Sequence, residues 1–357
     1  MRIHALEARQ FRNLQNVLIE PHPRFNVLSG DNGQGKTNLL EAIYLLGTLR
    51  SFRAGKTEEM VAFGAPQSLV RARVEKLETQ RLLEVQLRPG NKQARVDGKG
   101  ARAGDYFGGF NVVLFAPEDL RLPKGPPAGR RRFVDRAVWN AFPAYLGEVQ
   151  TYERVLKSRN AVLRDGGPAE MLEVYDEQLA RAAVAIVTRR RSLVEELAPR
   201  VRAAFARVTQ TGLELGISYE TAIDISNIEQ SMAQKLSADR RRDVARGATS
   251  SGPHVDDLEL ILDGRPARLY ASQGQLRAIV LALKIAEIEF LHAKLNDAPV
   301  LLLDDVSSEL DPTRNAQLFD FLKSVPCQAF ITTTHRDHVL LTEERLDYHV
   351  LAGEIRS

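Results

Sequence analysis

Eight residues near the amino end of the chain have the spacing of a phosphate-binding loop. The run Gly30–Thr37 fits the pattern G-x-x-x-x-G-K-[ST] at every fixed position. Glycines let successive backbone N–H groups turn toward an anion, and the N-terminus of a following helix adds positive potential. This pattern indicates binding of a nucleoside triphosphate, and an ordinary glycine-rich turn is the alternative. The residues expected to bind the nucleotide are Gly30, Asp31, Asn32, Gly33, Gln34, Gly35, Lys36, Thr37 and Asn38.

Two side chains of this loop and two distant carboxylates make up a candidate catalytic set. Lys36 would reach the β and γ phosphates, and the Thr37 hydroxyl would hold Mg²⁺. Far downstream, Pro299–Asp305 is an apolar run that ends in two carboxylates, which is typical of a buried parallel strand with ligands at its carboxyl end. We expect Asp304 to hold Mg²⁺ and Asp305 to orient or deprotonate the attacking water. The alternative is that the acidic pair caps the next helix.

Two further segments carry polar groups that suit a nucleotide site. Ser272–Arg277 reads S-Q-G-Q-L-R and opens a helical pattern, so a serine, a glycine and free N–H groups lie at one helix start. This is either a second anion site or a plain N-cap made by Ser272. Ser308–Asp311 follows the carboxylates, and Ala329–His335 is a strand that ends in a histidine. A lone histidine after a strand is more often structural than catalytic, so the order of these parts has to decide its role.

The surrounding elements are those that this chemistry needs. Phe25–Ser29 reads as a buried strand before the loop, and Asn38–Leu46 has helical spacing after it. Lys36 and Asp304 must meet across one nucleotide although they are 268 residues apart, so an insertion separates the two halves of the core. Two apolar runs in the insertion, broken at residues 166–168, predict an antiparallel helical pair. The runs are Leu146, Val149, Tyr152, Leu156 and Leu163, then Leu172, Tyr175, Leu179, Ala182, Ile186, Leu193 and Leu197.

Strand-like alternation marks residues 69–115, with a turn at Asp97–Gly98. The sequence therefore predicts an α/β head that combines a parallel or mixed sheet with antiparallel strands, and a compact helical arm as a second lobe. The predicted head comprises residues 1–118 and 251–357, and the predicted arm comprises residues 119–250. The sequence does not assign the helix at 272–290 to either lobe.

Composition agrees with an intracellular ATPase. The chain has 357 residues, of which 44% are hydrophobic, enough for one large or two modest cores. A single cysteine, Cys327, excludes a disulfide framework. No apolar stretch reaches the roughly 18 residues of a membrane span, and Met1–His4 does not begin a signal peptide. We expect a cytoplasmic protein without a membrane partner.

Charge is distributed unevenly along the chain. Residues 1–118 contain 17 basic and 12 acidic side chains, residues 119–250 contain 22 and 17, and residues 251–357 contain 10 and 17. The clusters Arg130–Arg132, Arg189–Arg191 and Arg240–Arg242 could neutralise phosphates along a duplex in a salt-sensitive way. The alternative for each cluster is a solvated helix face interleaved with glutamate.

The order of these motifs resembles that of the ABC-type ATPase heads, which include the SMC family. The resemblance implies an ABC-type P-loop head in which two subunits bury ATP between them. Ser272, Gln273, Gly274 and Gln275 of one subunit would then face the phosphate loop of the other, and His335 would sense the γ phosphate. A homodimer held together by ATP is what this resemblance implies.

Within this group the chain resembles the RecF family of bacterial recombinational repair factors. The segments that carry the resemblance are Phe11–Leu14, Gly30–Tyr44, Ser51–Arg53, Phe115–Leu120, Arg131–Asp135, Gly252–His254 with Asp256 and Asp257, and Leu301–Asp311. The resemblance adds Arg12 to the nucleotide-binding residues. It implies binding of ATP and of gapped DNA at junctions of double and single strands, a weak DNA-dependent ATPase, and help in loading RecA onto SSB-covered gaps. RecR and RecO would be partners, in repair, replication and the SOS response.

The chain departs from most ABC heads at two points. Asp305 stands where most carry a glutamate, as in the RecF family, and a shorter carboxylate that holds water less well implies slow turnover. No glutamine of the usual Q-loop, which couples nucleotide to the second lobe, can be identified. The rival interpretations are an ABC transporter ATPase cassette and a small-molecule kinase. The kinase leaves Ser272–Arg277 and Ser308–Asp311 without a role.

Overall fold

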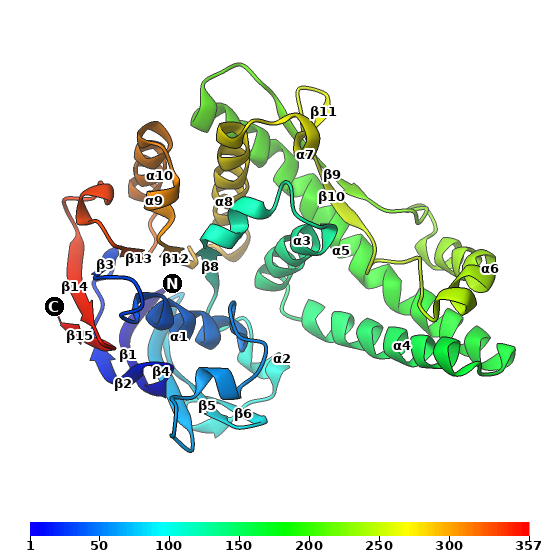
Figure 1. The fold of residues 1–357 in the computed structure, drawn as a ribbon, viewed down its shortest axis with the longest axis horizontal. Coiled ribbons are helices and arrows are strands. Elements are labelled where there is room, and N and C mark those ends of the chain that lie inside the picture. The colour runs from blue at the N-terminus through cyan, green and yellow to red at the C-terminus, as the bar shows by residue number, and fades with distance from the viewer. Residues whose placement is uncertain (357) are drawn as a thin grey trace. The chain divides into compact units, whose positions relative to one another are not determined.

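The computed structural model describes residues 1–356, which form two units (Figure 1). The first unit contains Met1–Arg121 and the chain from Val280 onward, and the second contains Leu122–Ile279. The lobes predicted from the sequence change after residues 118 and 250, whereas the units divide after residues 121 and 279. Residues 251–279 therefore pack within the second unit.

A six-stranded, mainly parallel sheet forms the centre of the first unit, in the order β15-β14-β3-β13-β12-β8. The pairs from β14 to β8 are parallel, and β15 pairs antiparallel with β14. The predicted parallel strand that ends at Asp304 is confirmed, with parallel neighbours on both sides. The strands are β3 (Phe25–Ser29), β8 (Val112–Phe115), β12 (Val300–Asp304), β13 (Ala329–Thr333), β14 (Arg345–Leu351) and β15 (Glu354–Arg356).

A second, antiparallel sheet has the order β2-β1-β4-β5-β6-β7. Its strands are β1 (Arg2–Phe11), β2 (Leu14–Ile19), β4 (Ser68–Lys76), β5 (Thr79–Arg88), β6 (Asn91–Val96) and β7 (Lys99–Gly100). The predicted turn at Asp97–Gly98 joins β6 to β7, with φ values of 52° and 77° that suit a two-residue hairpin. The predicted antiparallel series is wrong at its end, because β8 joins the parallel sheet instead.

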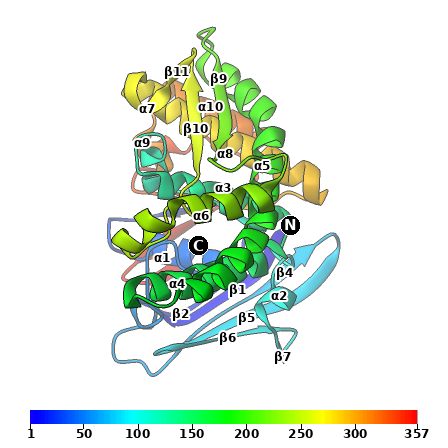
Figure 2. The same cartoon turned by 90° about the vertical axis from the view of Figure 1, so that its right-hand side faces the viewer.

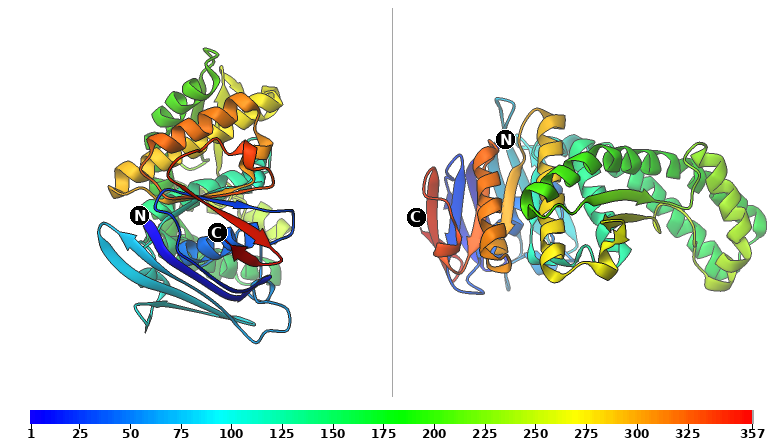
Figure 3. Two further views of the ribbon diagram at one scale, coloured as in Figure 1. Left: turned by 90° about the vertical axis from the view of Figure 1, so that its left-hand side faces the viewer. Right: turned by 90° about the horizontal axis from the view of Figure 1, so that it is seen from above.

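Helix α1 (Lys36–Thr48) packs between the two sheets, as Figure 3 also shows. The parallel strands are apolar on both faces because helices cover both. Leu302 of β12 belongs to the core with α1, whereas Leu301 and Leu303 face the helices on the other side. That side is covered by the carboxyl part of α8 (Gln273–Leu295) and by α10 (Pro312–Ser324). The short elements of the first unit are η1 (Glu58–Met60), α2 (Ala103–Tyr106), η2 (Pro117–Arg121), α9 (Val306–Glu309) and η3 (Arg336–His338).

The second unit combines long helices with a small sheet (Figure 2). The predicted helical pair is confirmed as α4 (Tyr145–Asp165) and α5 (Ala169–Thr209), which pack together on either side of the break at 166–168. The sequence did not predict the antiparallel sheet β11-β10-β9 of this unit. The remaining elements are α3 (Pro127–Ala141), β9 (Leu215–Glu220), α6 (Ile228–Arg246), β10 (Asp257–Leu262), β11 (Arg265–Pro266) and α7 (Ala267–Tyr270). Among residues 1–356, none of the helices combines the length and the apolar character needed to cross a bilayer.

Candidate nucleotide-binding site

The phosphate-binding loop joins β3 to α1 in a conformation that requires glycine at two positions. Gly30 has φ 150°, and a Cβ atom there would lie 2.3 Å from the carbonyl oxygen of Val350. Gly35 has φ 117°, and a Cβ atom there would lie 2.8 Å from Asn13 Oδ1. The backbone angle disfavours a side chain at both positions, and at Gly30 the backbone of Val350 also leaves no space for one. The loop is therefore shaped by β14 and by the β1–β2 turn as well as by its own sequence.

The carboxyl-terminal hairpin braces the same loop. The backbone N–H of Gly353 donates to Gln34 O at 2.8 Å, and that of Ala352 donates to Gln34 Oε1 at 2.7 Å. Asn13 Nδ2 donates to Gln34 O at 3.1 Å. Gln34 is therefore engaged by the protein, whereas the predicted binding residues Asp31, Asn32 and Gly33 are exposed.

Lys36 points back into the loop. Its ammonium donates to Gly30 O at 2.5 Å and to Asp31 O at 2.8 Å. Burial lowers the pKa of Lys36, and the carboxylates of Asp305 and Asp304 oppose that shift. The two carbonyls orient the ammonium without neutralising it, so the loop keeps the positive charge that phosphate oxygens require.

Thr37 and Asp304, predicted to share a metal, lie side by side. Thr37 Oγ1 donates to Asp304 Oδ1 at 2.7 Å, and Thr332 Oγ1 donates to the same oxygen at 2.8 Å. Thr332 was not identified from the sequence. The parallel pairing of β12 and β13 sets Asp304 directly opposite it, so the strand order would have pointed to it.

Asp305 directly follows the strand, and its carboxylate acts electrostatically on Lys36. Its backbone N–H donates to Thr332 Oγ1 at 2.9 Å, and its φ of 50° is one that aspartate tolerates better than most residues. Its Oδ1 atom is buried and receives no hydrogen bond within residues 1–356. The alternative that the acidic pair caps α10 is wrong, because Asp311 is the N-cap and accepts from Arg314 N at 3.1 Å.

The residues fit a magnesium ion held together with nucleotide phosphates. A hydroxyl and a carboxylate are hard oxygen ligands, and Mg²⁺ usually takes only one or two protein ligands beside phosphate and water. Burial raises the pKa of Asp304, which the Thr37 and Thr332 hydroxyls oppose and the charge of Glu118 reinforces, so a cation beside this carboxylate would be stabilising. Within residues 1–356, no group of three or more His, Cys, Asp or Glu forms a metal site by itself.

A polar network connects two further segments, Phe11–Leu14 and Ser51–Arg53, to the loop and the helix that follows it. Arg12 binds Glu41 of α1 through two hydrogen bonds of 2.9 and 2.8 Å and donates to the carbonyl oxygen of Glu59. Its guanidinium is thus engaged inside the protein, and a direct contact of Arg12 with the nucleotide stays a prediction. Asn38 Nδ2 donates to Asn13 Oδ1 at 2.8 Å, and Arg53 donates to Asn38 Oδ1 at 3.0 Å. Asn38 therefore links the segment Phe11–Leu14 to the segment Ser51–Arg53.

Two charged side chains near Asp304 were missed as site residues. Glu118 raises the pKa of Asp304 and Arg53 lowers it, after the larger effects of burial and of the two hydroxyls. Glu118 belongs to the segment Phe115–Leu120 and Arg53 to the segment Ser51–Arg53, both of which were singled out in the sequence. Their positions come from the ends of β8 and α1, which the motifs alone do not place.

The other predicted residues lie as follows. The backbone N–H of His335 donates to Thr333 Oγ1 at 3.0 Å, and its ring packs against His338 with a centroid distance of 5.3 Å. Ser308 Oγ donates to Asp305 O at 2.8 Å. The role of His335 as a γ-phosphate sensor stays a prediction.

Ser272 and its neighbours lie in the second unit, at the start of α8. Ser272 Oγ accepts from Gln275 N at 3.3 Å, and Gln275 Oε1 accepts from Ser272 N at 2.7 Å. This reciprocal pair is a capping box, so the N-cap interpretation of Ser272 is confirmed. Gln273 and Gly274 are the first two residues of the helix after the cap. A second role for these residues, in a neighbouring subunit's site, stays a prediction.

The basic clusters of the second unit largely form internal ion pairs. Arg130 binds both oxygens of Asp257 at 2.8 and 2.7 Å, and Arg190 binds both oxygens of Asp135 at 2.7 and 3.0 Å. Both guanidinium groups are buried. The expectation that these two arginines neutralise DNA phosphates is therefore wrong, because their charges are already paired away from water. The exposed members Arg132 and Arg241 have no ion pair in the described part of the chain.

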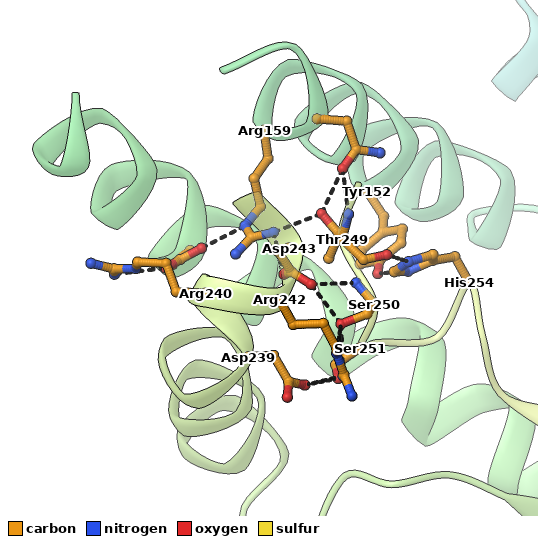
Figure 4. Close-up of polar contacts among 12 residues, drawn as sticks. Tyr152, Arg159, Asp239, Arg240, Arg242, Asp243, Thr249, Ser250, Ser251 and His254 are labelled. Carbon is orange, nitrogen blue, oxygen red and sulfur yellow. Dashed lines mark hydrogen bonds and ion pairs between the residues drawn. The ribbon is translucent and has the colours of Figure 1, made fainter. Parts of the chain in front are cut away.

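Figure 4 shows the third cluster around Asp243. Arg240 binds Asp176 Oδ2 at 3.0 Å, and Arg242 binds Asp239 at 2.9 Å. Arg159, which is fully buried, donates to Asp176 at 2.6 Å and to Asp243 at 2.8 Å. These pairs join α4, α5 and α6, so the arginines stabilise the second unit.

Comparisons with known proteins agree with the nucleotide-binding geometry described above. The family model of the RecF/RecN/SMC N terminal domain matches residues 2–351. The DNA replication and repair protein RecF of Anaeromyxobacter sp. (strain K) is 50% identical over 347 residues, covering 94% of this chain and 93% of that protein. The protein of the same name from Myxococcus xanthus (strain DK1622) is 48% identical, covering 94% and 91%.

The solved structures that are similar to this chain also include a RecF protein. The recombination mediator protein RecF-ATPrS in the RecFOR pathway matches with a TM-score of 0.91 at 30% identity, covering 99% of this chain and 97% of that one. An SMC head bound to the C-winged helix domain of ScpA matches with a TM-score of 0.59 at 16% identity, covering 100% and 96%. The second match shows a shared fold alone.

Asp304→Asn should stabilise the nucleotide-free protein at neutral pH by on the order of 1 kcal/mol, because it removes a buried charge. The folded pKa of Asp304 lies above the ordinary 3.8, so ionisation costs stability. That cost is absent below the unfolded pKa and grows as pH rises through the window up to the folded pKa. Urea unfolding of both proteins at acidic and neutral pH measures the difference.

Asp304→Ala is the matched control, because it also removes the charge but leaves Thr37 and Thr332 without their acceptor. The asparagine variant should lose magnesium-dependent nucleotide binding while gaining stability. An asparagine variant that is less stable than wild type at neutral pH would contradict the assignment of Asp304 as an uncompensated charge.

Arg190→Met should cost about 1 to 3 kcal/mol, because the partly exposed Asp135 and the carbonyl oxygen of Pro253 both lose a hydrogen-bond donor. Arg191→Met removes the same charge from an exposed pair with Glu195 and should cost about 0.5 kcal/mol or less. Thermal unfolding compares the two variants. If both lost equal stability, or if Arg190→Met alone weakened DNA binding without unfolding, the structural assignment of Arg190 would be wrong.

Proposed function

The chain belongs to the RecF family, and on that premise we propose that it is an ATP-dependent DNA-binding protein that mediates recombination in DNA repair and replication. One observation carries the nucleotide part of this proposal. Thr37 of the phosphate loop and Asp304 of β12 are joined by a 2.7 Å hydrogen bond, beside Lys36 and Asp305. Similar proteins are solved as RecF-ATP and RecF-ATPrS, which supports ATP as the nucleotide.

The chemistry proposed is slow hydrolysis of ATP, used as a switch. Lys36 and the loop N–H groups bind the phosphates, and Thr37 and Asp304 hold Mg²⁺, which supplies charge neutralisation when bound. Asp305 orients the attacking water and accepts its proton. Its unpartnered Oδ1 atom has a free acceptor position for that water. His335 contributes by sensing the γ phosphate.

The proposed unit of action is a homodimer formed with ATP. Ser272 to Gln275 supply a serine hydroxyl and helix N-terminal N–H groups, which suit the phosphates of a nucleotide bound to a second subunit. The capping box orients these groups in advance. ATP binding would close the dimer on DNA, and hydrolysis would release it.

The proposed substrate is gapped DNA, bound at the junction of double and single strands by backbone contacts. The relatives are named DNA replication and repair proteins, and the solved relatives belong to the RecFOR pathway. We propose RecR and RecO as partners and the loading of RecA onto SSB-covered gaps as the outcome, including during the SOS response. The proposed location is the cytoplasm.

The transporter cassette and the small-molecule kinase are not favoured. The family model covers residues 2–351, nearly the whole chain, and the matched relatives are repair proteins. A small-molecule kinase would also leave Ser272–Arg277 and Ser308–Asp311 without a role.

Sedimentation with ATP and Mg²⁺ should give a dimer for the wild-type protein and a monomer for Ser272→Arg, because a long cation would block the subunit contact. Asp305→Asn keeps the backbone conformation but cannot accept a proton, so its ATP dimer should persist while hydrolysis falls by about 10²- to 10⁴-fold. Ser237→Arg, at an exposed position of α6, is the matched control.

If the wild-type protein and all variants remained monomers in every nucleotide state, the dimer proposal would lose its basis. Unimpaired hydrolysis in Asp305→Asn would show that another group activates the water.

Duplex DNA should bind with an affinity that falls steeply with salt, because phosphate contacts release counterions. Fluorescence anisotropy with a labelled gapped duplex at several salt concentrations gives the slope, which steepens by about 0.9 for each phosphate neutralised. A flat salt dependence would contradict binding through the DNA backbone and would return the transporter cassette to consideration.

A further inference from the structure

The loop that follows β13 places an arginine beside the phosphate-binding loop. Ser29 and Thr333 are the last residues of β3 and β13, and they are paired directly in the parallel sheet. Arg336, which begins η3 just after β13, donates from Nε to Ser29 Oγ at 2.8 Å. Gly30, the first residue of the phosphate-binding loop, follows Ser29. The nucleotide chemistry described above gives Arg336 no role.

Hydrogen bonds on both sides fix this contact. Ser29 is buried, and its hydroxyl donates to Tyr348 O at 3.2 Å, so the lone pairs of Oγ are left to accept from Arg336. Thr333 Oγ1 donates to His335 O at 2.8 Å and accepts from His335 N at 3.0 Å, which holds the turn that leads to Arg336. The guanidinium is therefore placed by the ends of β3 and β13 together with β14.

The charge of Arg336 is not neutralised by the described part of the protein. Within residues 1–356 this arginine forms no ion pair, and it is exposed. Arginine carries five N–H donors in a planar fork, and the bond to Ser29 uses only the donor at Nε. The donors on Nη1 and Nη2 have no acceptor within the same residues. Their geometry suits two oxygen atoms of one phosphate.

Stability alone accounts poorly for this arrangement. A hydrogen bond from an exposed side chain to a neutral hydroxyl stabilises a fold only slightly. Holding a long arginine side chain in one conformation costs rotamer entropy of comparable size. The two effects offset each other, whereas a guanidinium that is already held in place binds an anion with less loss of entropy. The contact between Arg336 and Ser29 therefore favours binding of an anion over a purely structural role.

Lys36 indicates which anion this second cation is placed to bind. Its ammonium donates to Gly30 O at 2.5 Å, so Lys36 and Arg336 are anchored on consecutive residues at one strand end. The anion expected there is the phosphate chain of a nucleotide. His335, the proposed sensor of the γ phosphate, directly precedes Arg336. The loop after β13 thus offers a free guanidinium to the phosphate that the proposed mechanism already assigns to it.

We propose that Arg336 binds the terminal phosphate of the nucleotide, and that Ser29 is the positioning residue that holds its guanidinium for this contact. Arg336 is then a specificity-determining residue, because a nucleoside diphosphate lacks the group that it binds. Lys36 serves both nucleotides, and Arg336 serves the triphosphate alone. This inference rests on the proposed function, because it requires ATP to bind at the phosphate loop.

Isothermal titration calorimetry with ADP and with the β,γ-imido analogue of ATP, each with Mg²⁺, tests the proposal. The full chain carries Ser272→Arg as a background change, so that the proposed subunit contact does not add to the affinity. Arg336→Met should weaken binding of the analogue by about 10- to 100-fold and change binding of ADP by less than about twofold, because only the analogue has the third phosphate. Arg336→Lys should give an intermediate affinity, because lysine keeps the charge but not the fork.

Arg88→Met is the matched control, because Arg88 of β5 is also exposed and also donates from Nε to a neutral oxygen, Gln67 Oε1, at 3.2 Å. It should leave both affinities unchanged. Ser29→Ala removes the anchor and should cause part of the loss that Arg336→Met causes. The double variant should be little weaker than Arg336→Met, because both changes act through one guanidinium.

The possible outcomes separate this proposal from the proposed function. Equal weakening of both nucleotides by Arg336→Met, or unchanged binding of the analogue, would overturn the assignment of Arg336 to the terminal phosphate while ATP binding stands. A loss for Ser29→Ala that adds fully to the loss for Arg336→Met would overturn the positioning role of Ser29. A background protein that binds neither nucleotide would overturn the proposed binding of ATP and the role of Arg336 with it.

Discussion

The hydrogen bond between Thr37 and Asp304 is the constraint around which the first unit is organised. It joins side chains 267 residues apart at 2.7 Å, so the strands that end beside them must be parallel and nearly adjacent. β13 lies between β3 and β12 and supplies Thr332 to the same carboxylate oxygen. Because all three strands run in one direction, their carboxyl ends meet at one edge of the sheet. The site is a property of that edge more than of any single motif.

The nucleotide site also lowers the stability of the folded protein. Asp304 is held as a buried carboxylate with a raised pKa, and Lys36 as a buried ammonium with a lowered one. The glycines of the loop lie against Val350 and Asn13, so the last strands and the first turn share in holding its shape. Such unfavourable placement is expected where a charged ligand is to be bound, because the ligand supplies the missing countercharge. Stability and nucleotide binding therefore oppose each other at Asp304.

The second unit uses charge in another way. Arg130, Arg159 and Arg190 are buried, and each is paired with aspartate. A guanidinium in the interior must be neutralised, and the fork geometry of arginine meets a carboxylate through two bonds. These arginines therefore set the packing of helices and strands instead of forming a basic surface. Charge counted along the chain therefore overstates the positive charge exposed at the surface.

The sequence by itself determined the phosphate loop, the strand that ends at Asp304, the helical pair and the family. These depend on local spacing, on apolar periodicity and on fixed residue types, all of which are visible along the chain. Only the tertiary structure decided that Thr332 and Glu118 lie beside Asp304, that β8 joins the parallel sheet, and that Arg130 is buried. Each of these depends on which distant segment packs alongside, as Asp257 does against Arg130 from 127 residues away. Local pattern does not carry that information, because pairing between distant segments is set by the packing of the whole unit.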